Sequence, residues 1–417
     1  MKLLAYTSPA RGHLYPVVPI LLELRRRGHD VRAMTLAREV GGIAALGVEA
    51  EPVSPGVEAI ELEDWRARSQ ADRGRRALVA FAARAEPETA DLQDAIERHR
   101  PDALLLDVNC WGAATVAEAS GLPWAMLSPY LLMARSRDAP PFGLGLAPMR
   151  GPLGRARDTL LGALGEIVVD RTALPSVNRL RDRHGLPRLQ RFGELMERPA
   201  RMLVTTAEGF EYPRSDWAAN VRFVGPLDWS PPQQPPGWLA ELADPLVLVT
   251  CSTERQRDRA LLATALRVLP AAGFGVLGTS AAHDPDSFEA PPGSRVVRFL
   301  SHGAVLDRAA CVVCHGGMGI TQKALAAGVP VVVVPFGRDQ MDTARRVEWA
   351  GAGVRLPARK LMEKRLAAAV RQALELREGA QRTARVFAQA GGARMAVDCL
   401  EEIAAVAATC MSDASGQ

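Results

Sequence analysis

The chain has 417 residues, of which 48% are hydrophobic, 24% charged and 5% aromatic. This length corresponds to two or three globular domains, and the apolar fraction excludes an intrinsically disordered chain. The net charge of +4 comes from 51 basic and 47 acidic residues that are scattered without a polybasic block. We therefore expect no nucleic-acid partner and no electrostatic attachment to a membrane surface.

The chain also lacks the segments that would place it in or across a membrane. No uncharged apolar run reaches the roughly 18–20 residues that span a bilayer, and the first residues do not have the pattern of a signal peptide. Six cysteines in such a chain are expected to be reduced thiols. We expect a cytoplasmic protein without integral membrane association, either a monomer or a homodimer.

Hydrophobic periodicity predicts alternating strands and helices in the first half of the chain. The elements expected there are, in chain order, a strand at 2–6, a helix at 14–27, a strand at 30–36, helical residues at 60–100, a strand at 101–108, a helix at 112–120, a strand at 123–128, loops and helices at 138–200, and a strand at 200–206. Strand, helix and strand joined by short links form a β–α–β unit, which implies a parallel sheet covered by helices.

A second α/β pattern follows a proline-rich stretch at 225–237, which cannot form a helix or a central strand and is interpreted as a stiff linker. The elements expected after it are strands at 245–252, 273–279, 294–300, 309–314 and 328–336, and helices at 256–272, 319–327, 338–350, 363–376 and 380–408. The predicted organisation is a first domain at 1–224, the linker at 225–237, a second domain at 238–390, and a final segment at 391–417 whose helix crosses back to the first domain. Both domains are doubly wound, with the carboxyl ends of their strands facing each other.

One histidine and one aspartate stand where strands of the first domain end. His13 lies in the turn after the first strand, and Asp107 ends the strand at 101–108. Because both ends lie at the same sheet edge, the two residues can form a base and its orienting carboxylate. The alternative is a solvated turn histidine and an aspartate that caps the next helix.

The strongest local signal is the glycine-rich loop that follows the strand at 309–314. Three glycines within 316–319 open a helix, so backbone amides converge on one point that suits a phosphate, and His315 adds a side-chain donor. Asp339 and Gln340 follow the next strand at the same edge, where they can hydrogen-bond sugar hydroxyls.

The string HGGMGITQKALAAGVPVVVVPFGRDQMDTARRV, with ARGHLYPVVPILLELRRRGHDV near the start, resembles the nucleotide-sugar-dependent glycosyltransferases of the GT-B fold. The similarity is strongest to the bacterial natural-product and antibiotic group, which is related to plant UDP-glycosyltransferases. It implies an α/β fold of two Rossmann-like doubly wound domains that face each other. The activity implied is an inverting transfer from a nucleoside-diphosphate sugar to a small-molecule acceptor, with no cofactor and no metal.

The resemblance also assigns roles to matching positions. It implies that His13 is the general base and Asp107 its partner. The diphosphate is expected at Ser252, Thr253, His315, Gly317, Met318 and Gly319, the nucleobase and ribose at Phe299, Leu300, His302 and Lys323, and the donor sugar at Asp339 and Gln340.

Two positions depart from the family pattern. The family has a glutamate for the ribose where this chain has Lys323, which carries no acceptor, and Ile320 replaces a common threonine. Lys323 is expected either to pair with a phosphate or to lie exposed on its helix. This departure leaves open a catalytically inactive protein of the same fold that only binds nucleotide. A second alternative, within enzymes, is a sugar-nucleotide 2-epimerase-like protein on the same fold.

Two apparent cofactor motifs are set aside. The CVVCH string at 311–315 matches a haem-attachment pattern, but it lies in an apolar strand that enters the glycine loop. Asp284 and Asp286 imitate a metal-binding DxD motif within a polar loop, and no zinc spacing is present.

Overall fold

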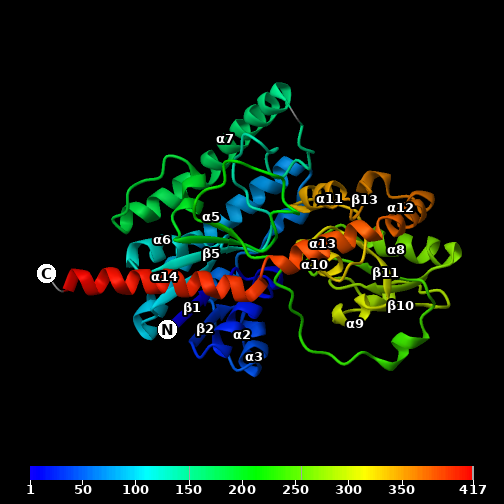
Figure 1. Cartoon of the computed structure of the whole chain (residues 1–417), viewed down its shortest axis with the longest axis horizontal. Helices are drawn as coiled ribbons and strands as arrows, with labels where there is room; N and C mark the ends of the chain where they lie inside the picture. The colour runs from blue at the N-terminus through cyan, green and yellow to red at the C-terminus, as the bar shows by residue number, and fades with distance from the viewer. Residues whose placement is uncertain (150, 255, 416–417) are drawn as a thin grey trace.

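The computed structural model describes residues 1–415 except 150 and 255, with the side chains of 410–415 left out. Its two parallel sheets lie in the left and right halves of the molecule in Figure 1. This arrangement confirms the predicted α/β fold of two doubly wound domains.

The first sheet has the strand order β3-β2-β1-β4-β5-β6-β7, and every paired strand is parallel. Its strands are β1 (Lys2–Tyr6), β2 (Asp30–Thr35), β3 (Glu49–Pro52), β4 (Ala103–Asp107), β5 (Trp124–Ser128), β6 (Arg201–Val204) and β7 (Val221–Phe223). Its helices are α1 (Arg11–Leu14), α2 (Val18–Arg26), α3 (Val40–Ala45), α4 (Pro55–Glu58), α5 (Gln70–His99), α6 (Trp111–Ser120) and α7 (Pro152–Arg183).

The second sheet has the order β10-β9-β8-β11-β12-β13, again parallel throughout. Its strands are β8 (Leu246–Thr250), β9 (Gly275–Thr279), β10 (Ser294–Val297), β11 (Ala309–Cys314), β12 (Val331–Val333) and β13 (Gly353–Arg355). The helices after the linker are α8 (Arg259–Val268), α9 (Gly303–Leu306), α10 (Met318–Ala326), α11 (Gln340–Trp349), α12 (Glu363–Glu375), α13 (Arg377–Gln389) and α14 (Gly392–Ser415).

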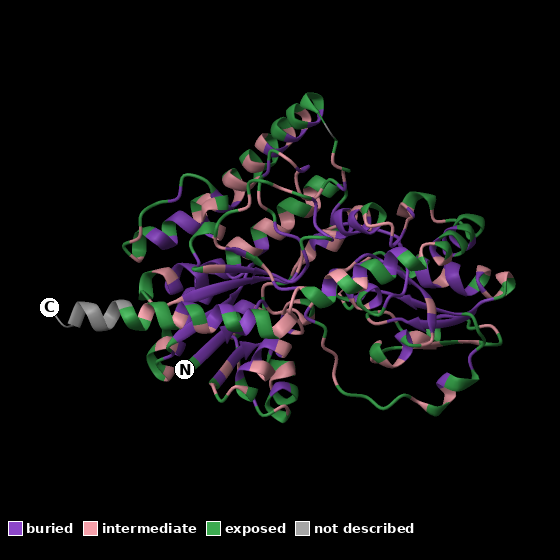
Figure 2. Cartoon of the chain, viewed as in Figure 1, coloured by how far each residue is buried: buried purple, intermediate pink, exposed green. Residues whose placement is uncertain are grey.

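Each central strand is buried on both faces because helices cover both sides of each sheet, and Figure 2 shows the sheets in the colour of buried residues. This burial explains why the central strands are runs of valine and leucine rather than alternating patterns. The segment between β7 and the short helical turn at Gly237–Glu241 contains neither helix nor strand. The domain boundaries given above stay predictions.

Helix α14 lies along the first domain, far from the sheet that precedes it in the chain (Figure 1). Its apolar residues Val397, Leu400 and Ile403 belong to the same core as β1 and α2. Arg27 at the end of α2 pairs with Asp398 at 2.6 Å and with Glu401 at 2.7 Å.

One predicted element was wrong in detail. The single helix expected at 380–408 is broken into α13 and α14, because Gly391 and Gly392 adopt left-handed conformations with φ of 89° and 60°. The region 138–200, expected as loops and helices, contains loop residues and the 32-residue helix α7, which continues through Pro175.

Candidate active site

The first half of the site is a histidine–aspartate pair at the carboxyl edge of the first sheet. Strands β1 and β4 are neighbours in register, so the turn that carries His13 lies beside the end of β4. His13 Nδ1 is 2.7 Å from Asp107 Oδ2, and the side chain of Asp107 is completely buried. The other oxygen of Asp107 accepts the backbone N–H of Asn109 at 3.0 Å. The carboxylate therefore has partners on both oxygens and holds the imidazole in one orientation.

Two further residues surround the other edge of this imidazole. Asn109 Nδ2 lies 3.4 Å from His13 Nε2, and the hydroxyl of Tyr130 donates to Asn109 Oδ1 at 2.7 Å. Burial, and after it the charge of Asp107, raises the pKa of Tyr130 well above its usual value, so its hydroxyl stays a donor. With Nδ1–H donating to Asp107, Nε2 carries the lone pair and can accept a proton.

Asn109 and Tyr130 were missed by the sequence analysis. Asn109 stands two residues after Asp107, at the sheet edge that was already singled out, so its position was an available signal. Tyr130 follows β5, the next strand of the sheet, but a tyrosine in a loop carries no distinctive spacing.

Glu88, on α5, is a further carboxyl group that contacts the start of α6. It is buried, and its Oε2 accepts the backbone N–H of Gly112 at 2.9 Å, at the start of α6. Burial, with a smaller contribution from Asp107, raises the pKa of Glu88 to about 8. At neutral pH Glu88 is therefore largely uncharged.

The titration of Glu88 makes folding stability pH-dependent. Because its pKa is higher in the folded than in the unfolded chain, its stabilising contribution is complete below about pH 4.5 and is lost as the pH rises through about 8. We expect the Glu88→Gln variant to lose less stability than the wild type between pH 5 and 8, by on the order of 3 kcal/mol. Urea unfolding of both proteins at these two pH values measures the difference; equal pH dependence would contradict the assignment.

The second half of the site is the loop between β11 and α10. Gly316 has φ of 96°, and a side chain there would meet Val333 at 2.6 Å, so this position requires glycine. Gly317 is the N-cap of α10, whose first amides have no acceptor within the helix. A methyl group on Gly319 would meet nothing within 4 Å, so there is open space beside the first turn of α10.

His315 adds a free polar atom to this loop. Its side chain is buried, and its Nδ1 has no hydrogen-bond partner among the residues described in the structure. Burial lowers the pKa of His315, which favours the neutral imidazole. The loop thus combines the N-terminal amides of a helix with a buried imidazole nitrogen that has no hydrogen-bond partner among the described residues.

Ser252 and Thr253, which follow β8, differ in their surroundings. Ser252 is buried, and its Oγ accepts the backbone N–H of Glu254 at 3.2 Å and the amide of Gln256 at 3.0 Å. The Ser252 hydroxyl proton is thus free to donate to a ligand. Thr253 is exposed.

Asp339 and Gln340, at the start of α11, also differ. Gln340 Oε1 accepts the backbone N–H groups of Phe336 and Gly337 at 2.8 and 3.1 Å, and its Nε2 donates to Gln256 at 2.6 Å. The side chain of Gln340 therefore stabilises the loop that precedes α11. Burial raises the pKa of Asp339, while a backbone hydrogen bond and the charges of Arg338 and His13 lower it.

The residues expected around the nucleobase lie at the edge of the second sheet. Phe299 is 45% exposed and Leu300 is buried. His302 Nε2 is 3.3 Å from Thr279 Oγ1, and burial, with a smaller contribution from Lys323, lowers the pKa of His302 to about 4.

Lys323 follows neither of the two expected alternatives. Its Nζ pairs with Asp228 at 2.7 Å, donates to the carbonyl of Trp229 at 2.8 Å and also donates to Ser230 Oγ. The side chain is only 12% exposed. All three ammonium hydrogens of Lys323 thus point to linker residues. Lys323 therefore holds the linker against α10 and has no hydrogen left for a phosphate or for solvent.

Cys251, Asp258 and His283 are close enough together to be considered as metal ligands. However, Asp258 uses one oxygen for His283 Nε2 at 2.9 Å and the other for the Ser252 N–H at 2.6 Å. Burial raises the pKa of the Cys251 thiol, which disfavours the thiolate that binds metals. We interpret this cluster as a structural contact that holds the loop after β8 against the loop after β9.

The sequence is 36% identical over 388 residues to 4'-demethylrebeccamycin synthase of Lentzea aerocolonigenes, an alignment that covers 90% of this chain and 92% of that protein. The chain belongs to the glycosyltransferases of natural-product biosynthesis. Residues 275–403 of the glycosyltransferase match the family model described as the C-terminal domain of erythromycin biosynthesis protein CIII-like proteins.

Solved structures place this glycosyltransferase in the GT-B fold. The glycosyltransferase of kitacinnamycin superposes with a TM-score of 0.73 at 23% identity, covering 96% of this chain and 98% of the other. VinC, solved in complex with dTDP, gives a TM-score of 0.71 at 22% identity, covering 97% and 99%. The family resemblance predicted from the motifs is thereby confirmed. None of the helices in the described part of the chain is long and apolar enough to span a membrane.

Proposed function

We propose that this glycosyltransferase moves a sugar from a nucleoside-diphosphate sugar to a hydroxyl of a small natural-product acceptor, with inversion at the anomeric carbon. The observation that carries the proposal is the contact of the partly exposed His13 with the buried Asp107, which leaves Nε2 as the proton acceptor in one domain, while the glycine loop before α10 belongs to the other.

The chemistry follows from these two halves. His13 Nε2 accepts the proton of the acceptor hydroxyl while that oxygen forms a bond to the anomeric carbon. The bond from this carbon to the phosphate oxygen breaks on the opposite face, and its electron pair leaves with the nucleoside diphosphate. Asp107 stabilises the resulting imidazolium, as in other histidine–carboxylate pairs.

The leaving diphosphate is assigned to the loop between β11 and α10. The amides of Met318 and Gly319, the Nδ1 of His315 and the hydroxyls of Ser252 and Thr253 are its proposed donors. Such fixed donors stabilise developing negative charge without rearranging during the reaction. VinC was solved with dTDP, which supports a nucleoside diphosphate as the ligand class.

The proposed reaction requires no metal ion and no cofactor, because helix amides and side-chain donors meet the leaving-group charge. We expect EDTA treatment to leave the transfer rate unchanged within about twofold, with each of UDP, TDP, GDP and ADP sugars tried as donor. The anomeric configuration of the product is read by NMR. A product that retains the donor configuration, or activity lost on chelation and restored by a divalent cation, would contradict the mechanism.

A further inference from the structure

The loop that precedes α11 is held by the other domain. Asp64, in the short helical turn at Glu63–Arg66, accepts two hydrogen bonds from Arg338, with Nε at 2.6 Å and Nη2 at 2.7 Å from its two oxygens. Asp64 is buried, and the side chain of Arg338 is 24% exposed. Parallel double hydrogen bonds between a guanidinium and a carboxylate are strong and fix the relative orientation of both groups.

Two more residues of the first domain bind the backbone of this loop. Arg73, on the first turns of α5, donates to the carbonyl of Phe336, and Gln70 Nε2 donates to the carbonyl of Arg338 at 3.2 Å. Arg73 Nε also donates to the carbonyl of Asp64 at 3.4 Å. This hydrogen bond joins the start of α5 to the turn at Glu63–Arg66, the two segments that contact the loop. The side chains of one domain therefore bind consecutive parts of a loop in the other.

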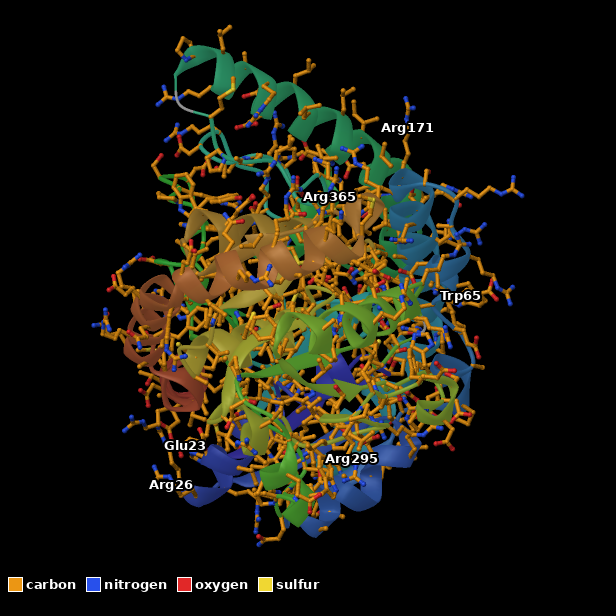
Figure 3. All side chains as sticks on the ribbon, turned by 90° about the vertical axis from the view of Figure 1, so that its right-hand side faces the viewer. Glu23, Arg26, Trp65, Arg171, Arg295 and Arg365 are labelled. Atoms are coloured by element: carbon orange, nitrogen blue, oxygen red, sulfur yellow. The ribbon has the colours of Figure 1, made fainter. Side chains whose placement is uncertain are left out.

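Residues that make these contacts also line a small pocket between the two domains. It is lined by Asp64, Trp65 and Arg73 of the first domain and by Gln256, Phe336 and Arg338 of the second. Trp65, the neighbour of Asp64, is labelled in Figure 3 beside the blue ribbon of the first domain.

The backbone of the loop is unusual at the residue that is held. Arg338 has φ of 55°, a left-handed conformation that is unfavourable for a residue with a side chain. Such a conformation persists where surrounding contacts enforce it, here those from Asp64 and Gln70 on one side and Gln340 on the other. The next residue is Asp339, so the conformation of Arg338 decides where the Asp339 carboxylate is placed.

We propose that Asp64 is a positioning residue for transfer: acting through Arg338, it places Asp339 for the donor sugar, so the sugar subsite forms only when the two domains are docked. This inference rests on the proposed function of Asp339. The proposed diphosphate donors all belong to the second domain. Loss of Asp64 should therefore impair use of the sugar and leave binding of the bare nucleoside diphosphate intact.

The test compares Asp64→Asn with the wild type and with Arg338→Gln. We expect Asp64→Asn to lower kcat/KM for the nucleotide sugar at least tenfold, while the Kd of the matching nucleoside diphosphate changes less than twofold. The double variant should be no worse than the worse single variant, because both residues act through one contact. Glu86→Gln, which breaks the exposed pair with Arg183, is the matched control and should change neither quantity.

Hydrogen exchange supplies a readout that does not depend on activity. Amides at 336–340 should exchange faster in Asp64→Asn than in the wild type, whereas those at 316–320 should not change. Unchanged exchange at 336–340, additive effects in the double variant, or an equal loss of diphosphate binding would overturn the positioning role. Failure of the wild type to transfer sugar would instead refute the proposed function, and the exchange data would still decide whether Asp64 holds the loop.

Discussion

The His13→Ala variant should lose about 10²–10⁴-fold in kcat for sugar transfer, the usual contribution of a positioned general base. The wild-type imidazole is held by Asp107 at 2.7 Å and leaves Nε2 as the proton acceptor. Without it, the acceptor hydroxyl must lose its proton to water while it attacks. The nucleoside diphosphate should bind the variant with unchanged affinity, because His13 belongs to the other domain.

Asp107→Asn is the companion variant for this experiment. An amide keeps the shape of the carboxylate but favours the tautomer whose Nε2 is protonated, so kcat should fall although the fold is retained. Initial rates at saturating donor and acceptor measure both effects, and isothermal titration with nucleoside diphosphate is the control. Transfer at the wild-type rate in His13→Ala would show that another group accepts the proton.

Gly317→Ala is expected to weaken nucleoside-diphosphate binding by about tenfold or more. The backbone of Gly317, with φ of −62° and ψ of 138°, is open to alanine, but the added methyl carbon would lie 2.5 Å from His315 Nε2. The imidazole must turn away, which removes its Nδ1 from the diphosphate. A hydrogen bond to a charged group contributes about 1.5–3 kcal/mol, and each 1.4 kcal/mol corresponds to tenfold in Kd.

Gly303→Ala is the matched control for Gly317→Ala. Gly303 lies in the same domain, and a methyl group there would meet nothing within 4 Å. Both variants are compared by isothermal titration and thermal unfolding, so that a loss of affinity is separated from a loss of folded protein. If Gly317→Ala bound the nucleotide as tightly as Gly303→Ala, the diphosphate would not depend on His315.

The fold could be predicted from the sequence because its signals are local and repeated. Valine- and leucine-rich strands such as β4 and β11 are followed by helices that end at glycines, and this alternation specifies parallel sheets. The same logic identified His13, Asp107 and the loop at 315–319, since the carboxyl ends of parallel strands are where such residues gather.

The remaining parts of the site depend on contacts between distant segments. Lys323 meets the linker through Asp228, and Asp64 meets Arg338 across the domain boundary, at sequence separations that no periodicity encodes. Gln340 is a further example, because its amide binds its own loop in addition to standing at the expected sheet edge. Side-chain pairing between domains becomes visible only when the two sheets are placed together.

The most direct test of the account is a crystal structure of the protein with a nucleoside diphosphate and its acceptor. We expect the diphosphate within hydrogen-bond distance of His315 Nδ1 and the first amides of α10. We also expect the acceptor hydroxyl about 3 Å from His13 Nε2. A diphosphate bound away from α10, or an acceptor hydroxyl that faces a side chain other than His13, would contradict the account.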